Sequence, residues 1–264
     1  MNKETIGRLA ARLTPDLAAD LAIDAHVNSQ RLVRSARRLA DARDFAAGFS
    51  LAMIAREETA KMMLAYSFLM GETSAQRLLE ILWSHPKKQA AGLAYSWIAE
   101  QLLRAGQLEG LTTRAATIDE AVGELVVAAE RFRDCQIESF EFDVPALERR
   151  FDNALNRNDE RARQDSLYVS LVEHNGDLQI VTPAGVTERQ CRELINEVET
   201  LLQMPHRADL TVDTTEITDE DRGSASRETY KAILLRAFTP FMLADPKAGG
   251  VTPNVNIDLW KAPQ

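Results

Sequence analysis

The pattern of apolar and polar positions is most unusual over residues 45–70, where apolar residues occur on nearly every side of the predicted helix. A helix that is apolar all round is typical of the middle of a bundle. Its centre nevertheless carries Arg56, Glu57, Glu58 and Lys61. Charges in such a place cost free energy unless they are paired and hydrogen-bonded. Either the fold keeps a polar cluster inside, or this is a functional site.

The turn of about 100° per residue places Glu58 and Lys61 on the most apolar stripe of this helix. The stripe is formed by Leu51, Ile54, Glu58, Lys61, Ala65 and Phe68. We expect Glu58 and Lys61 to pair, because they are three residues apart, and to face a buried site or a cleft. Glu57 points further round, and Arg56 lies across the helix, where solvent reaches it more easily. A surface pair on an ordinary helix is the commoner use of this spacing.

Caps and breaks predict the other elements. Thr14 caps a helix that Pro15 opens, Asp44 caps the central helix, and Gly71 ends it. Further helices are predicted over 23–42, 73–83, 86–102, 117–133, 145–164, 187–204 and 226–243. Strands are predicted over 166–172 and 178–181, joined at the turn dipeptide Asn175-Gly176.

The predicted fold is mainly α, a helical bundle with a small β-hairpin and a C-terminal extension. We assign residues 1–165 to the bundle, 166–204 to the hairpin and a helix packed on the bundle, and 205–264 to an extension with one helix and a tail rich in Pro and Gly. The net charge of −9 disfavours nonspecific coating of nucleic acid, although it leaves room for a local basic pocket. No signal peptide precedes residue 20, and the charges inside 45–70 argue against a membrane span, so we expect a cytoplasmic protein.

No cofactor or metal is predicted. The four histidines are scattered, and Cys135 and Cys191 are far apart, so no zinc spacing occurs. Lys61 stands where a di-iron helix would carry a histidine three residues after Glu58. Neither a glycine-rich phosphate loop nor a serine nucleophile elbow is present.

Three segments together resemble the AbiV family of abortive-infection proteins, which are helical relatives within the HEPN superfamily. The first joins Asn28 to an Ala-rich helix that carries the box Glu57-Glu58-Thr59-Ala60-Lys61, and the second is the box His85-Pro86-Lys87-Lys88. The third is a charged helix that runs into a Leu-Tyr-Val hairpin, a proline and a helix led by Thr-x-Glu. It is matched by residues 161–172, Pro183 and residues 187–193. The resemblance covers residues 20–204.

The resemblance implies an HEPN-like bundle, a role in phage defence and assembly as a homodimer. Many HEPN proteins are metal-independent ribonucleases whose late helix carries an Arg followed, a few residues later, by a His. That motif is absent from the predicted late helix over 145–164. Ribonuclease activity would therefore require a different set of residues.

Glu58, Lys61, His85 and Lys88 are the candidate catalytic residues. Histidine can act as general base or acid near neutral pH, and a lysine can stabilise charge on a phosphate. Glu58 would orient Lys61 or His85, while Asn28, Glu57 and Lys87 would bind substrate. In the alternative interpretation His85 braces the helix junction before Pro86, and the two lysines form a solvated face.

Two functions follow from these residues. The first is a phage-defence effector, toxin-like in its effect, that acts on RNA or the translation machinery through the Glu/Lys/His cluster. The second is a non-enzymatic protein that binds a phage or host protein, with a structural cluster. A nucleotide-binding bundle would instead show a closed pocket around Glu58. The basic side of the second helix, with Arg31, Arg34, Arg37 and Arg38, is interpreted as a solvated face.

Overall fold

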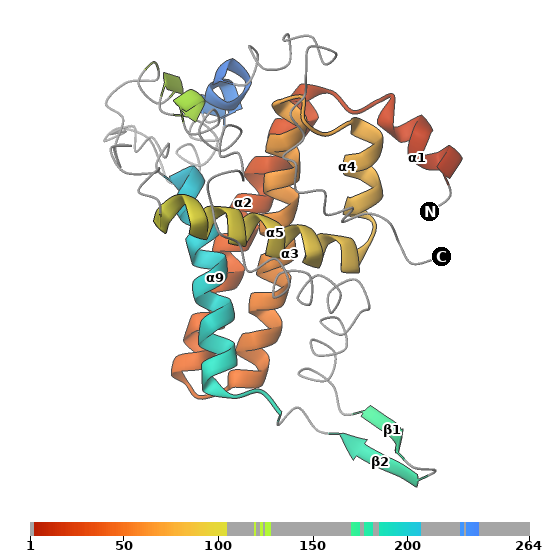
Figure 1. Cartoon of the computed structure of the whole chain (residues 1–264), viewed down its shortest axis with the longest axis vertical. Coiled ribbons are helices and arrows are strands. Elements are labelled where there is room, and N and C mark those ends of the chain that lie inside the picture. Colours follow the sequence, from red (N-terminus) through yellow and green to blue (C-terminus); the bar gives the residue numbers. More distant parts are fainter. Residues whose placement is uncertain are drawn as a thin grey trace.

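The structure is a computed structural model. It describes residues 3–104, 119, 122–123, 125–127, 170–174, 177–181, 185–206, 228–229 and 231–237. Its elements are α1 (Lys3–Ala10), α2 (Pro15–Asp41), α3 (Phe45–Leu69), α4 (Ala75–Leu82), α5 (His85–Arg104), β1 (Ser170–His174), β2 (Asp177–Val181) and α9 (Glu188–His206) (Figure 1). The predicted helix over 145–164 and the tail from 244 lie outside the described residues, as does most of the predicted helix over 117–133.

Helix α3 is the centre of the described fold. It pairs with α2, packs against α9, and is crossed by α5, as Figure 1 shows. These neighbours lie on different sides of α3, so its buried residues occur all round the helix. The central position predicted from its pattern is therefore confirmed, and the described fold is mostly helical, as the sequence predicted.

Local capping explains where the helices begin and end. The Thr14 hydroxyl accepts a hydrogen bond from Leu17 N at 3.2 Å, and the Asp44 carboxylate accepts one from Ala47 N at 3.2 Å. Gly71 has φ 75° just after α3, where a left-handed residue ends a helix. These three predictions are confirmed. One boundary was wrong: α2 runs unbroken from Pro15, because no breaker separates its first turns from the helix predicted over 23–42.

Residues 231–237 pack into the bundle core. Ile233, Leu234 and Ala237 are fully buried in a cluster with residues of α2 and α3. Lys231 Nζ pairs with Asp16 and Asp20 of α2, each at 2.8 Å. This part of the predicted C-terminal extension thus contributes side chains to the bundle core.

The two strands pair antiparallel, with Ser170 opposite Val181 and His174 opposite Asp177. They lie close to the strands predicted over 166–172 and 178–181, while the predicted turn at Asn175-Gly176 lies outside the described residues. After β2 the chain enters α9, where the Thr187 hydroxyl accepts a hydrogen bond from Gln190 N at 3.3 Å and the Gln190 side chain accepts one from Thr187 N at 2.9 Å. These two reciprocal bonds form a capping box. Within the described ranges, no helix is both long and apolar enough to span a bilayer.

Candidate functional site

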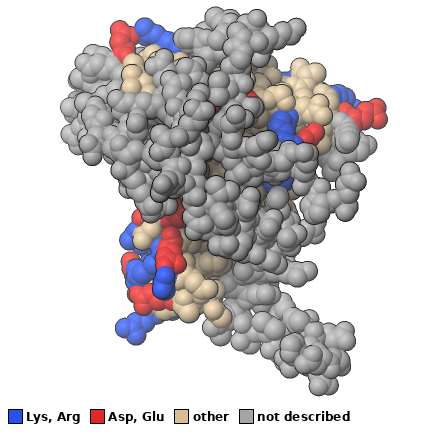
Figure 2. Space-filling model, in the orientation of Figure 1, with Lys and Arg blue, Asp and Glu red and all other residues tan. Residues whose placement is uncertain are grey.

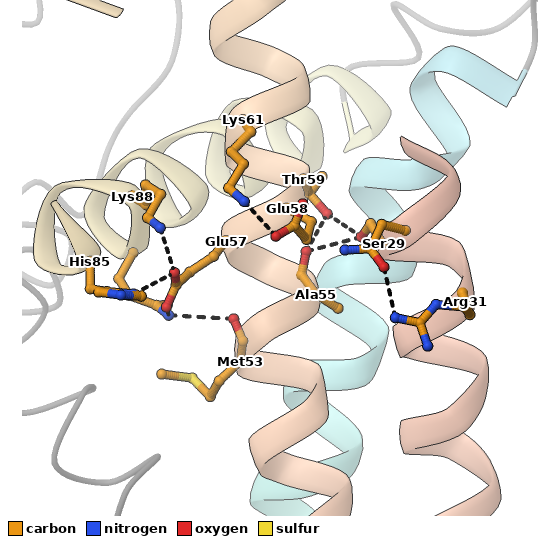
Figure 3. A network of polar contacts seen from close by, with 12 residues as sticks. Ser29, Arg31, Met53, Ala55, Glu57, Glu58, Thr59, Lys61, His85 and Lys88 are labelled. Carbon is orange, nitrogen blue, oxygen red and sulfur yellow. Dashed lines mark hydrogen bonds and ion pairs between the residues drawn. The ribbon is translucent and has the colours of Figure 1, made fainter. Parts of the chain in front are cut away.

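A buried carboxylate occupies the crossing of α3 and α5. Glu57 Oε2 accepts hydrogen bonds from His85 Nδ1 at 2.8 Å and Lys88 Nζ at 3.0 Å (Figure 3). Its other oxygen accepts a hydrogen bond from Gln89 Nε2 at 2.7 Å. Only 5% of the Glu57 side chain is exposed. Three donors therefore replace the water that this carboxylate loses on folding.

The first turn of α5 brings these donors together. His85, Lys88 and Gln89 have the spacing i, i+3 and i+4, which places them on one helix face. Ser84 fixes that turn, since its carbonyl accepts a hydrogen bond from Lys88 N at 2.9 Å and its hydroxyl accepts one from Lys87 N at 3.4 Å.

The network continues to α9 through Arg56. Arg56 Nε donates to Gln89 Oε1 at 2.8 Å, and its Nη1 lies 3.7 Å from Glu197 Oε1. The prediction that Arg56 is solvated was wrong, because it is only 4% exposed. Helices α5 and α9 cover the side of α3 that the face arithmetic left open. We call Arg56, Glu57, His85, Lys88, Gln89 and Glu197 the Glu57 group.

Glu58 and Lys61 form a separate pair. Lys61 Nζ donates to Glu58 Oε1 at 2.6 Å, so the predicted pairing is confirmed. His85 and Lys88, the expected companions of this pair, contact Glu57 instead. Glu58 and Lys61 are 14% and 25% exposed, and Figure 3 shows Glu58 pointing away from α5 while Glu57 points toward it. Consecutive helical residues are about 100° apart, so two adjacent glutamates cannot face the same neighbour.

The remaining predicted residues lie apart from the Glu57 group. The Asn28 side chain accepts a hydrogen bond from Arg31 at 2.9 Å. The adjacent Ser29 bonds to Ala55 O at 3.0 Å and to the Thr59 hydroxyl at 2.7 Å, which places Asn28 at the level of Glu58. Lys87 lies near Glu80 of α4. There the Gln76 hydrogen bond, helped by the charges of Arg77 and Lys87, lowers the pKa of Glu80.

Only one edge of the Glu57 group is open to solvent. The His85 side chain is 57% exposed, whereas that of Lys88 is 8% exposed. Because Glu57 binds Nδ1, the other ring nitrogen of His85 can accept a proton from an incoming molecule. Glu57 itself, predicted to bind substrate, is covered by its three donors.

Sequence reasoning missed Arg56, Gln89 and Glu197 as members of the group. The spacing of His85, Lys88 and Gln89 could have revealed Gln89, since it continues the same helix face. No local signal marks Glu197, which lies far along the chain. Among the residues that the structure describes, no cluster of three or more His, Cys, Asp or Glu side chains could hold a metal ion.

A family model described as AbiV, of the HEPN class, matches residues 17–203. This span is well over half of the 264-residue chain and contains both polar groups. The chain belongs to the AbiV family. No curated protein and no solved structure matches it. Membership in the AbiV family indicates a role in abortive infection, a form of phage defence.

The AbiV match covers the whole Glu57 group but not the whole core. It includes α3, α5 and nearly all of α9, which together supply the whole Glu57 group. It stops before residues 231–237, which nevertheless complete the core around α2 and α3. This AbiV protein therefore builds part of its core from residues beyond the matched span.

Proposed function

We propose that this AbiV protein is an abortive-infection effector that cleaves RNA, with His85 as its general base. The observation that supports the proposal is the contrast between the two partners of one hydrogen bond. Glu57 is buried and fixed by three donors, while His85, held by it at 2.8 Å, is 57% exposed. A histidine oriented by a buried carboxylate and open to solvent is suited to proton transfer.

The proposed reaction needs no metal ion. His85, protonated at Nδ1, takes the proton of a ribose 2′-hydroxyl on its other ring nitrogen. The 2′-oxygen attacks the adjacent phosphorus, and the bond from phosphorus to the 5′-oxygen breaks. The products are a 2′,3′-cyclic phosphate and a 5′-hydroxyl, whose oxygen takes its proton from water. Glu57 is a positioning residue that holds the ring and stabilises the imidazolium.

The first turn of α5 offers a place for the phosphate. His85 and Lys87 both lie there, and the positive end of the helix dipole favours an anion. Lys88 is turned inward to Glu57, so Lys87 is the lysine of the predicted box that is proposed to contact substrate. The protein's net charge of −9 does not oppose this, because the interaction is local.

A non-enzymatic role is the second candidate, and a different observation favours it. The Glu57 group joins α3, α5 and α9, and Arg56 and Lys88 balance the charges of Glu57 and Glu197. A group whose only role is to fix the three helices relative to one another would make the same buried contacts. The partner would then be a phage or host protein. The homodimer, the translation machinery as a target and the cytoplasmic location stay predictions.

The test compares His85→Gln with wild type on labelled RNA, scoring 2′,3′-cyclic phosphate ends. We expect cleavage to fall by about 100-fold or more, which is the usual contribution of a general base. Thermal stability should change little, because the ring is mostly exposed. Lys61→Gln is the matched control, since its pair is separate from His85. RNA left intact by a growth-arresting wild type would reject the ribonuclease in favour of the interaction protein. Full cleavage by His85→Gln would reject His85 as the general base.

A further inference from the structure

Trp83 is an exposed aromatic residue beside His85. It follows α4 directly and is 49% exposed. Of the Phe, Tyr and Trp side chains that the structure describes, Trp83 is the one in the exposed class. The core does not use this large apolar ring, although α4 buries its other face through Leu78, Leu79 and Ile81. The exposed indole is therefore available to a ligand.

The backbone on both sides of Trp83 is fixed. Trp83 N donates to Leu79 O at 3.2 Å, and Ser84 N donates to Ile81 O at 3.0 Å. Ser84 then precedes α5, which begins at His85 and follows α4 directly (Figure 1). Two successive Cα–Cα steps of about 3.8 Å place the Cα atoms of Trp83 and His85 at most about 7.6 Å apart. The backbone positions of Trp83 and His85 are thus fixed relative to each other.

We propose that Trp83 stacks on a nucleobase of single-stranded RNA and so holds the strand across His85. The inference deepens the proposed function and rests on it for the role of His85. An exposed indole offers a flat apolar face to any of the four bases, and Lys87, four residues further along the chain, adds a cation for the phosphate. Bases inside a duplex already stack on each other, so duplex RNA cannot use this platform.

Stacking on one aromatic ring tolerates sequence, because every base has a flat face. This AbiV protein should therefore bind unpaired strands with little base preference. A protein partner that covered Trp83 instead would show no such distinction between single and double strands.

Binding is measured without cleavage by using a fluorescein-labelled 2′-O-methyl RNA strand, which has no free 2′-hydroxyl to react. Fluorescence anisotropy gives the affinity of the full-length protein. We expect Trp83→Leu, which keeps apolar bulk but loses the flat face, to bind about 5- to 150-fold more weakly. Trp83→Phe should recover part of the affinity. Leu17→Ala is the matched control, because Leu17 is 52% exposed on α2, and it should bind like wild type.

A second measurement tests stacking without the Trp83→Leu variant, so its result does not depend on whether that variant folds. The chain has three tryptophans, so replacing Trp97 and Trp260 by Phe leaves Trp83 as the only indole. Stacking on the unlabelled 2′-O-methyl strand should quench its fluorescence, and the matching duplex should not.

Several results would overturn the inference. The wild type could bind no strand, or Trp83→Leu could bind within twofold of the wild-type affinity. Trp83→Phe could recover none of the lost affinity, or the strand and the duplex could quench Trp83 fluorescence equally. Failure of the proposed function looks different. In that case the wild type binds the uncleavable strand through Trp83 yet leaves ordinary RNA uncut. If instead Trp83→Leu cleaves RNA as fast as the wild type, this inference alone is rejected.

Discussion

Gly92 of α5 lies directly against Arg56 of α3. A Cβ atom at Gly92 would stand 2.8 Å from Arg56 Cγ and 3.2 Å from the Arg56 carbonyl oxygen. The missing side chain lets α5 cross close to α3, and it lets the Arg56 stem pass between the helices toward Gln89 and Glu197. The geometry of the Glu57 group depends on this contact.

Replacing Gly92 by Ala should destabilise the protein. Alanine is favoured over glycine in a helix by about 1 kcal/mol, but overpacking against Arg56 costs about 1–3 kcal/mol. Thermal denaturation should therefore show a lower midpoint. Gly7→Ala in α1 is the matched control, because nothing lies within 4 Å of its Cβ position, and it should be neutral or stabilising. Equal shifts for both variants would contradict the close contact.

Glu57→Gln and Glu58→Gln make the same change at adjacent residues and should differ greatly in cost. The first leaves Lys88 buried without its carboxylate, which costs about 3–5 kcal/mol of unfolding free energy. The second breaks a partly exposed pair and should cost less than about 1 kcal/mol. Urea denaturation measures both values.

Loss of the Lys88 charge should restore much of this stability. The double variant Glu57→Gln with Lys88→Met removes the unpaired cation and should unfold at higher urea than Glu57→Gln alone. If the two single glutamine variants were equally stable, the buried pair would have no special role.

The free energy of unfolding of the protein should fall in alkaline solution because of Tyr95. Burial raises the pKa of Tyr95 to about 12, from 10.0 for an ordinary tyrosine, while the hydrogen bond with Ser67 acts in the opposite direction. Between these values the unfolded chain loses the phenol proton and the folded chain keeps it, so stability decreases as pH rises. Urea midpoints between about pH 10 and about pH 12 should fall less steeply for Tyr95→Phe than for wild type. Parallel slopes would contradict the raised pKa.

Residues beyond the AbiV match should contribute to stability. Ile233 is fully buried, and its truncation to Ala should cost about 2–5 kcal/mol by leaving a cavity against α2 and α3. Arg236→Ala is the control, because that side chain is 60% exposed and bridges to Asp119, and its loss should cost under about 1 kcal/mol. Similar unfolding midpoints for both variants would place residues 231–237 outside the core.

Local signals in the sequence predicted the helix ends well. The helix ends depend on contacts and backbone angles within a few residues of Thr14, Asp44 and Gly71. These local roles depend little on the rest of the fold. The surroundings of α3 depend instead on which helices dock against it. Because α3 has no polar face, its pattern could not decide whether Glu57 or Glu58 meets α5, nor that α9 brings Glu197 to Arg56.

The pairing of Lys231 with Asp16 and Asp20 has a consequence for the timing of synthesis. The partners are 215 and 211 residues apart in the chain. At about 5–20 residues per second, at least about 10 s separate the emergence of the two aspartates from that of the lysine. The N-terminal end of α2 therefore cannot complete its packing until residues 231–237 have also emerged from the ribosome.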